Sequence, residues 1–166
     1  LQSLVITKTI NNVGYLTLNR PKAYNALNVE MFEVLYRTLK AWEVDPNIQV
    51  IILDSVIEKA FCAGGDVKSL VLDLAKPEGM DLAKQFFVKE YSTDYLIHQY
   101  PKPILCLASG ITMGGGVGIM NGCSHRVVFE DTLMSMPEMN IGFFPDVGAS
   151  YFLNKKDPVL GKFLGL

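Results

Sequence analysis

Two short segments that favour strands open the chain. They cover residues 4–10 and 15–19, and residues 11–14 between them read Asn-Asn-Val-Gly. Asn and Gly tolerate the left-handed backbone of a tight turn. The pattern predicts a β-hairpin at the start of the domain.

A helical pattern follows the break at Arg20-Pro21-Lys22. Asn28 can cap a helix whose apolar residues recur every three or four positions, and the Asp45-Pro46 pair should end it. Residues 80–98 show a compatible spacing and predict a second, longer helix. The apolar residues of the first pattern are Val29, Phe32, Leu35, Leu39 and Trp42.

Short apolar runs at residues 50–53 and 103–108 have the length of buried strands. Each precedes a Gly-rich turn and then a helical pattern, and this order is typical of α/β proteins. Residues 126–129 and 133–136 predict two more short strands, and a helix should begin after Pro158. We predict a single α/β domain over residues 1–166.

Composition narrows the classes of protein. The 166 residues are 49% hydrophobic and carry a formal net charge of -2, with the basic residues scattered along the chain. That charge pattern does not favour nucleic acid as a partner, and no apolar run approaches the roughly 20 residues that cross a bilayer. We therefore expect a soluble protein without a leader. Both ends look trimmed, since the chain starts at Leu1 and stops within a helical pattern.

The spacing of the Cys and His residues gives little support for disulfide bonds or a metal site. Cys62, Cys106 and Cys123 are widely spaced, which fits a reducing compartment better than a disulfide framework. His98 and His125 have no ligand at metal-binding spacing, so we assign them structural roles and expect no metal site.

The two Gly-rich turns, residues 61–67 and 110–118, are the most informative segments. Each lies between a strand and a helix, where glycines let the backbone approach a ligand and the helix start presents free N–H groups. Two such turns could aim two N–H groups at one carbonyl oxygen, as an oxyanion hole does. Close packing of helix on strand is the alternative. Ile119 interrupts a dinucleotide fingerprint, and there is no P-loop sequence.

Four motifs in order resemble those of the crotonase, or enoyl-CoA hydratase/isomerase, superfamily. They are Asn-Arg-Pro-Lys-Ala-Tyr-Asn-Ala-Leu at 19–27, the turn at 61–67, the glycines at 114–116 and Met-Pro-Glu at 136–138. The resemblance implies a crotonase (ClpP-like) fold of repeated ββα units that binds a coenzyme A thioester, with the C-terminal helical part missing. It also implies a homo-oligomer when the protein is full length.

The resemblance further assigns the binding residues. The N–H groups of Gly65 and Gly115 would form the oxyanion hole, and coenzyme A would be part of the substrate, with no separate cofactor. The implied coenzyme A contacts are Lys22, Ala63, Gly65, Asp66 and Val67.

The carboxylates select a branch of the superfamily. Hydratases use two Glu residues, and Gly118 stands where the first would fall, whereas Glu138 matches the second. Residues 136–148 are similar to the branch that hydrolyses 3-hydroxyisobutyryl-CoA in valine breakdown, in which an Asp follows the Glu by eight residues. That resemblance implies a catalytic and substrate-binding set of Glu90, Gly115, Glu138 and Asp146.

The expected chemistry is attack on a polarised thioester. Glu138 would deprotonate water or attack directly, Asp146 would donate a proton or bond a substrate hydroxyl, and Glu90 would help to hold that hydroxyl. Alternatives for these residues are a turn for Glu138, a helix cap for Asp146 and a solvated helix face for Glu90. Asp66 is also expected to cap a helix.

Two other functions stay open on this evidence. One is an enoyl-CoA hydratase or isomerase that relies on Glu138 alone, in which Asp146 has no role. The other is a non-catalytic subunit with the same fold. The bacterial cytoplasm and the mitochondrial matrix both suit the expected compartment.

Overall fold

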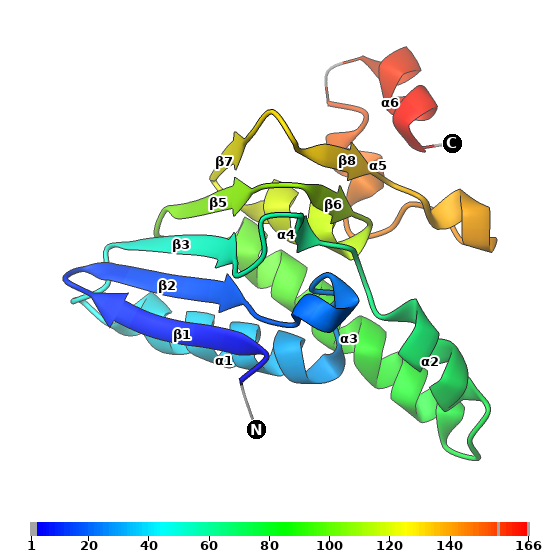
Figure 1. Cartoon of the computed structure of the whole chain (residues 1–166), viewed down its shortest axis with the longest axis horizontal. Coiled ribbons are helices and arrows are strands. Elements are labelled where there is room, and N and C mark those ends of the chain that lie inside the picture. The colour runs from blue at the N-terminus through cyan, green and yellow to red at the C-terminus, as the bar shows by residue number, and fades with distance from the viewer. Residues whose placement is uncertain (1–2, 156, 166) are drawn as a thin grey trace.

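The computed structural model describes residues 3–155 and 157–165. Its strands and helices alternate along the chain and pack in layers (Figure 1). The strands are β1 (Val5–Ile10), β2 (Val13–Leu18), β3 (Val50–Ser55), β4 (Ala60–Cys62), β5 (Ile104–Ala108), β6 (Ile111–Met113), β7 (His125–Val128) and β8 (Leu133–Ser135). The helices are η1 (Pro21–Ala23), α1 (Val29–Val44), α2 (Val67–Leu74), α3 (Gly79–His98), α4 (Gly115–Gly122), η2 (Glu138–Ile141), α5 (Ala149–Phe152) and α6 (Pro158–Gly165).

The strands form two sheets. The larger has the order β1-β2-β3-β5-β7, in which only β1 and β2 are antiparallel, and the smaller is a parallel β4-β6-β8 sheet. Successive strand pairs divide between the sheets, so β3, β5 and β7 lie in the large sheet while β4, β6 and β8 lie in the small one. In Figure 1 β6 and β8 lie beyond the ends of β5 and β7. This arrangement confirms the predicted α/β organisation of repeated ββα units.

The opening hairpin packs on α1. Asn28 caps this helix, because its side chain accepts a hydrogen bond of 3.0 Å from the Met31 N–H. The Trp42 ring lies flat against Gly14 of β2, where a β-carbon would come within 2.6 Å of ring atoms. Gly14 is therefore required for the close approach of helix and sheet. The hairpin and both long helices agree with the sequence prediction to within one or two residues.

The strands β4 and β6 of the small sheet are the main departure from the prediction, whereas β7 and β8 confirm the short strands predicted at residues 126–129 and 133–136. Both β4 and β6 have three residues, which is too short for an alternating pattern, and they overlap the segments that read as Gly-rich turns. These strands bring both turns to the same edge of the molecule. In the described part of the chain no helix is long and apolar enough to cross a membrane.

Candidate active site

The first Gly-rich turn is fixed by its own backbone. Ala63 donates to the Tyr24 carbonyl at 2.9 Å, Leu27 donates to the Gly64 carbonyl at 2.7 Å, and Asp66 donates to the Leu27 carbonyl at 2.8 Å. Gly64 has a φ of +102°, which only glycine adopts readily. These bonds hold the peptide of Gly65 between two anchored neighbours.

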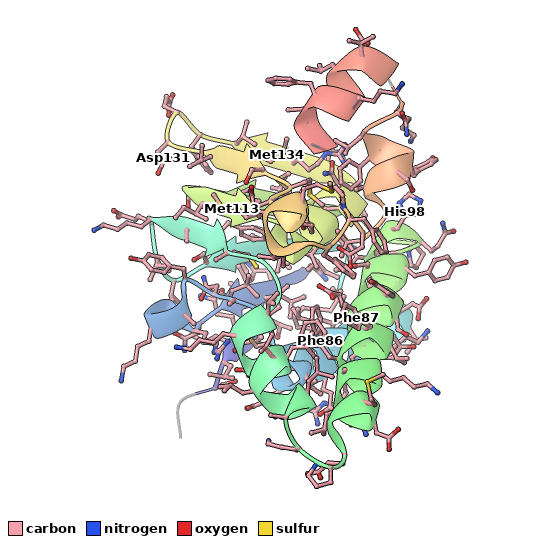
Figure 2. All side chains as sticks on the ribbon, turned by 90° about the vertical axis from the view of Figure 1, so that its right-hand side faces the viewer. Phe86, Phe87, His98, Met113, Asp131 and Met134 are labelled. Atoms are coloured by element: carbon pink, nitrogen blue, oxygen red, sulfur yellow. The ribbon has the colours of Figure 1, made fainter. Side chains whose placement is uncertain are left out.

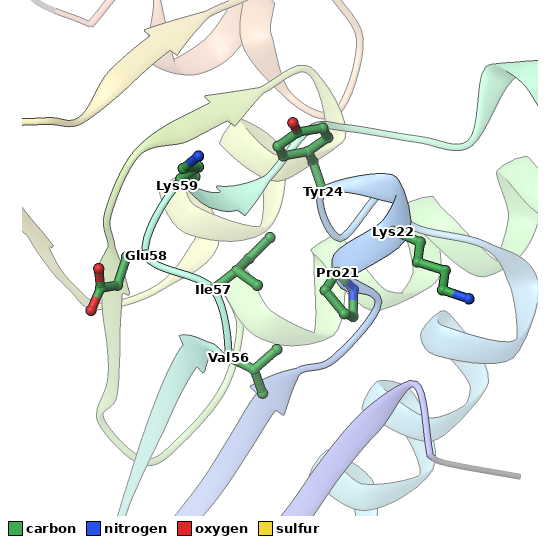
Figure 3. Close-up of a pocket in the computed structure, with 7 residues that line it drawn as sticks. All are labelled: Pro21, Lys22, Tyr24, Val56, Ile57, Glu58 and Lys59. Carbon is green, nitrogen blue, oxygen red and sulfur yellow. The ribbon is translucent and has the colours of Figure 1, made fainter.

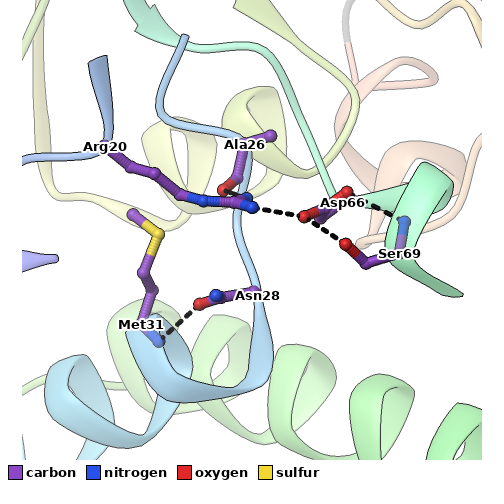
Figure 4. Close-up of polar contacts among 6 residues, drawn as sticks. All are labelled: Arg20, Ala26, Asn28, Met31, Asp66 and Ser69. Atoms are coloured by element: carbon purple, nitrogen blue, oxygen red, sulfur yellow. Dashed lines mark hydrogen bonds and ion pairs between the residues drawn. The ribbon is translucent and has the colours of Figure 1, made fainter. Parts of the chain in front are cut away.

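Asp66 closes this turn by capping α2 (Figure 4). Its carboxylate accepts from the Ser69 N–H at 3.0 Å and from Arg20 Nη2 at 2.7 Å. Burial alone would raise its pKa, but these bonds outweigh burial and hold the pKa of Asp66 below its usual range. The predicted cap is confirmed. The Asp66 carboxylate is thus occupied by the protein itself.

The second Gly-rich turn lies against the first. Gly114 has a φ of +48° and precedes α4, and a β-carbon on Gly115 would lie 3.3 Å from the Gly65 nitrogen. In the described part of the chain, neither the Gly65 nor the Gly115 N–H donates to another backbone group. Gly115 is the first residue of its helix, so its N–H has no partner within that helix. Two unpaired N–H groups from adjacent turns are what an oxyanion hole requires.

The carboxyl groups of Glu138 and Glu90 lie against Gly114 and Gly115. A β-carbon on Gly114 would lie 2.8 Å from Glu138 Oε1, and a β-carbon on Gly115 would lie 2.5 Å from Glu90 Oε1. Glu138 is 7% exposed and Glu90 is 3% exposed. Side chains at 114 and 115 would therefore displace both acids. The alternative of a solvated helix face for Glu90 is wrong, since its side chain lies on the buried face of α3.

Asp146 is the third acid, held by α3. Tyr91 Oη donates to Asp146 Oδ2 at 2.6 Å across 55 positions of sequence. Asp146 does not cap α5 with its side chain, because Gly148 occupies the N-cap position and no side chain bonds there. The alternative of a helix-capping Asp146 is thus wrong, although its backbone carbonyl accepts from Ala149 N at 2.7 Å.

The three acids perturb one another. Burial raises the pKa of Glu90 to about 8, and the negative charges of Asp146 and Glu138 add to that rise. Burial is also the main cause that raises the pKa values of Glu138 and Asp146, while the Tyr91 hydrogen bond opposes the rise at Asp146. Because its pKa is about 8, Glu90 keeps its proton at neutral pH.

Asp94 is a fourth acid that the sequence analysis missed. It lies one helical turn after Glu90, and both of its carboxyl oxygens are buried without a hydrogen-bond partner among the described residues. Burial, then Glu90 and Asp146, raise its pKa well above the usual range. The i,i+4 spacing from Glu90 was a usable signal, because it places both residues on one face of α3.

Aromatic rings shield the acids on one side. Phe86 and Phe87 project from α3 in Figure 2, and Phe86 lies edge-on to Phe32 of the core. Phe87 stacks on Phe143 with centroids 6.0 Å apart, and Phe143 stacks on Phe144 at 4.5 Å. This apolar wall adjoins Gly65, because a β-carbon there would lie 3.0 Å from Phe86 Cζ. It lowers the local polarity, which accounts for the effect of burial on the acids.

Lys22 lies away from the acids, in a groove of about 610 Å³ between η1 and the β3–β4 connection. Figure 3 shows Lys22 on one side of this groove and Lys59 on the other, with Tyr24 between them. Tyr24 also accepts the bond that anchors Ala63, so the groove and the first Gly-rich turn share one segment.

The histidines stand outside this group. His98 lies edge-on to Tyr151 with centroids 5.9 Å apart, and His125 Nδ1 is 3.0 Å from Ser124 Oγ. Cys62, Cys106 and Cys123 are free and buried. No cluster of potential metal ligands occurs among residues 3–155 and 157–165.

The fold and the cleft together are those of a crotonase-type protein. A solved carnitinyl-CoA dehydratase from Mycobacterium thermoresistibile matches 99% of this chain and 48% of its own, with a TM-score of 0.94 and 38% identity. The family model for enoyl-CoA hydratase/isomerase matches residues 13–166. The chain belongs to the enoyl-CoA hydratase/isomerase family.

The curated relatives include both a 3-hydroxyisobutyryl-CoA hydrolase and a ribosomal protein. The chain is 44% identical to the mitochondrial 3-hydroxyisobutyryl-CoA hydrolase of Danio rerio over 99% of this chain and 42% of that protein. It is 43% identical to the small ribosomal subunit protein mS47 of Neurospora crassa over 98% of this chain and 32% of that protein. The chain thus spans less than half the length of these relatives.

Proposed function

We propose that the protein hydrolyses a short 3-hydroxyacyl-CoA thioester, with 3-hydroxyisobutyryl-CoA as the substrate that its relatives favour. The observation that carries this proposal is the placement of Glu90 and Glu138 directly on Gly115 and Gly114, beside the two unpaired N–H groups. Those N–H groups would receive the charge that develops on the thioester oxygen, a contribution worth ~3 kcal/mol per donor. Coenzyme A enters as part of the substrate, and the proposed reaction uses no other cofactor.

The proposed chemistry begins at Glu138. This carboxylate either removes a proton from water or attacks the carbonyl carbon to give an anhydride that water then opens. In both routes the carbon–sulfur bond breaks and the thiolate takes a proton. Glu90, protonated at neutral pH because its pKa is about 8, would donate a hydrogen bond to the substrate hydroxyl, while Asp146 accepts one. This division of roles supports selection for a 3-hydroxy group.

The same site suits hydration less well. Double-bond hydration in this family needs a second Glu near Glu138, and Gly118 occupies that position. A β-carbon on Gly118 would lie 2.6 Å from Val147 Cβ, so no larger side chain fits there. Asp146 would also have no role in an isomerase that uses Glu138 alone.

A structural role is the second candidate, favoured by the similarity to mS47. A purely structural subunit has no need for buried acids with raised pKa values, because such groups destabilise a fold. Glu90, Glu138 and Asp146 are all present in this chain. Hydrolysis therefore remains our primary proposal, with the mitochondrial matrix as its compartment.

Thiol release from 3-hydroxyisobutyryl-CoA tests the proposal, measured beside hydration of crotonyl-CoA. Glu138→Gln and Asp146→Asn should each reduce thiol release by about 100-fold or more at unchanged folding. Asp131→Asn is the matched control, since Asp131 is an exposed acid at the β7–β8 turn (Figure 2) and should have no effect. Hydration without thiol release would favour the hydratase alternative. Inactivity of the unaltered protein in both assays would favour a structural subunit.

A further inference from the structure

A cavity of about 720 Å³ lies between α3, α4 and α5, next to the acids of the candidate site. Tyr95 and Tyr151 form aromatic parts of its lining, while Asp94 and Asn121 belong to its polar lining. The active-site chemistry proposed above does not use this space. Its volume is nevertheless within the range of ligand-binding pockets.

The cavity and the acid cluster share a boundary. Tyr91 lines the cavity and also donates to Asp146, and Gly118 lines it from α4, the helix that begins at the oxyanion hole. Val147 follows Asp146 immediately and lines the cavity as well. Asp146 is thus joined by Tyr91 and by its chain neighbour Val147 to the lining of a space large enough for several more carbon atoms.

Val147 fills this boundary closely. It is 8% exposed, and a β-carbon on Gly118 would lie 2.6 Å from its Cβ and 2.8 Å from its Cγ2. The bare backbone of Gly118 is what allows the valine side chain to sit against α4. Val147 thus packs directly against α4 at the edge of the cavity.

Val147 also has an unusual backbone. Its φ is +43°, a region that a β-branched residue rarely adopts, and Gly148 follows with a φ of +83°. Such a conformation is disfavoured and persists only where the surroundings impose it. Here the Tyr91 bond to Asp146 and the Ala149 N–H bond to the Asp146 carbonyl hold the segment on both sides.

We propose that Val147 is a specificity-determining partition that restricts the acyl group to a short chain by closing the active site from the cavity behind it. The inference rests on the proposed acyl-CoA site. A longer acyl group would have to pass Val147, and a residue held in a disfavoured backbone conformation by the hydrogen bonds of its neighbours acts as a fixed wall. A short branched acyl group would end against that wall.

Val147→Gly is the variant that opens the partition. Glycine adopts a φ of +43° without strain, so the relief of strain offsets much of the loss of buried methyl groups. The variant should therefore fold. Ile48→Ala is the matched control, because Ile48 is 3% exposed before β3 and does not line the cavity.

The test measures binding of two non-hydrolysable thioether analogues, S-butyl-CoA and S-octyl-CoA, by titration calorimetry. Each additional buried methylene strengthens binding by ~fourfold. Val147→Gly should improve the Kd of S-octyl-CoA relative to that of S-butyl-CoA at least tenfold, whereas Ile48→Ala should leave the ratio of the two Kd values unchanged.

The outcomes separate the two proposals. If both analogues bind and Val147→Gly leaves the Kd ratio unchanged, the partition is wrong while the acyl-CoA site stands. If neither analogue binds to the unaltered protein, the acyl-CoA site and the partition both fail. A tenfold preference for S-octyl-CoA that is already present in the unaltered protein would also overturn the partition.

Discussion

The glycine turns of the candidate site, here called its floor, and its acids, here called its rim, are positioned by different kinds of contact. The floor, residues 63–65 and 114–115, is positioned by main-chain hydrogen bonds and by the start of α4. The rim, Glu90, Glu138 and Asp146, consists of side chains from two distant segments, and the charges of Glu138 and Asp146 raise the pKa of Glu90. The geometry of the floor is therefore insensitive to pH, whereas the charge on the acids of the rim changes with pH. Three substitutions can test this division.

Gly115→Ala should have the largest effect, because it alters the floor itself. The new β-carbon would lie 2.5 Å from Glu90 Oε1 and 3.3 Å from the Gly65 nitrogen. We expect kcat for thiol release to fall about 100- to 1,000-fold, as for loss of an oxyanion donor. Gly142→Ala is the control, since it places a methyl group in open space at a positive φ and should affect only stability. A larger loss of activity in Gly142→Ala than in Gly115→Ala would contradict the assigned floor.

Glu90→Gln should change the pH dependence of stability. The folded-state pKa of Glu90, about 8, lies above its value in the unfolded chain, near 4.5. Its contribution to stability is therefore complete below pH 4.5 and is lost as the pH rises toward 8. The variant should be more stable than the unaltered protein at pH 8 by on the order of 4 kcal/mol. Urea unfolding at pH 5 and pH 8 measures this gain, and an equal gain at both values would show that Glu90 is not the titrating group.

Tyr91→Phe should have the smallest effect of the three. It removes the hydrogen bond that opposes the rise in the Asp146 pKa, so that pKa should rise further. The acid limb of the kcat/KM profile should move to higher pH, with a loss of about tenfold at pH 6. Tyr95→Phe removes an exposed hydroxyl from the same helix and should leave the profile in place.

The elements that periodicity defines were predictable from the sequence. The hairpin, α1 and α3 follow from residue spacing and from the Asn28 cap. The strands β4 and β6 were not predictable, because three residues give no period and their stability comes from pairing with distant strands.

The residues of the candidate site also fall into those that a local motif identifies and those that depend on distant contacts. The glycines and Glu138 were found through motifs, since local backbone geometry fixes which residues can stand there. The Tyr91–Asp146 bond joins residues 55 positions apart, and the Val147 conformation depends on packing against Gly118, so no local pattern encodes either. Glu90 is buried because neighbouring helices pack against one face of α3.

Trp42 offers a way to observe all these variants. It is the single tryptophan of the chain and is 9% exposed against Gly14. Its emission should shift to longer wavelength when the hairpin separates from α1, because water then reaches the indole. Every substitution discussed above lies outside that contact. Fluorescence can therefore count folded molecules in each variant without a signal from the cleft.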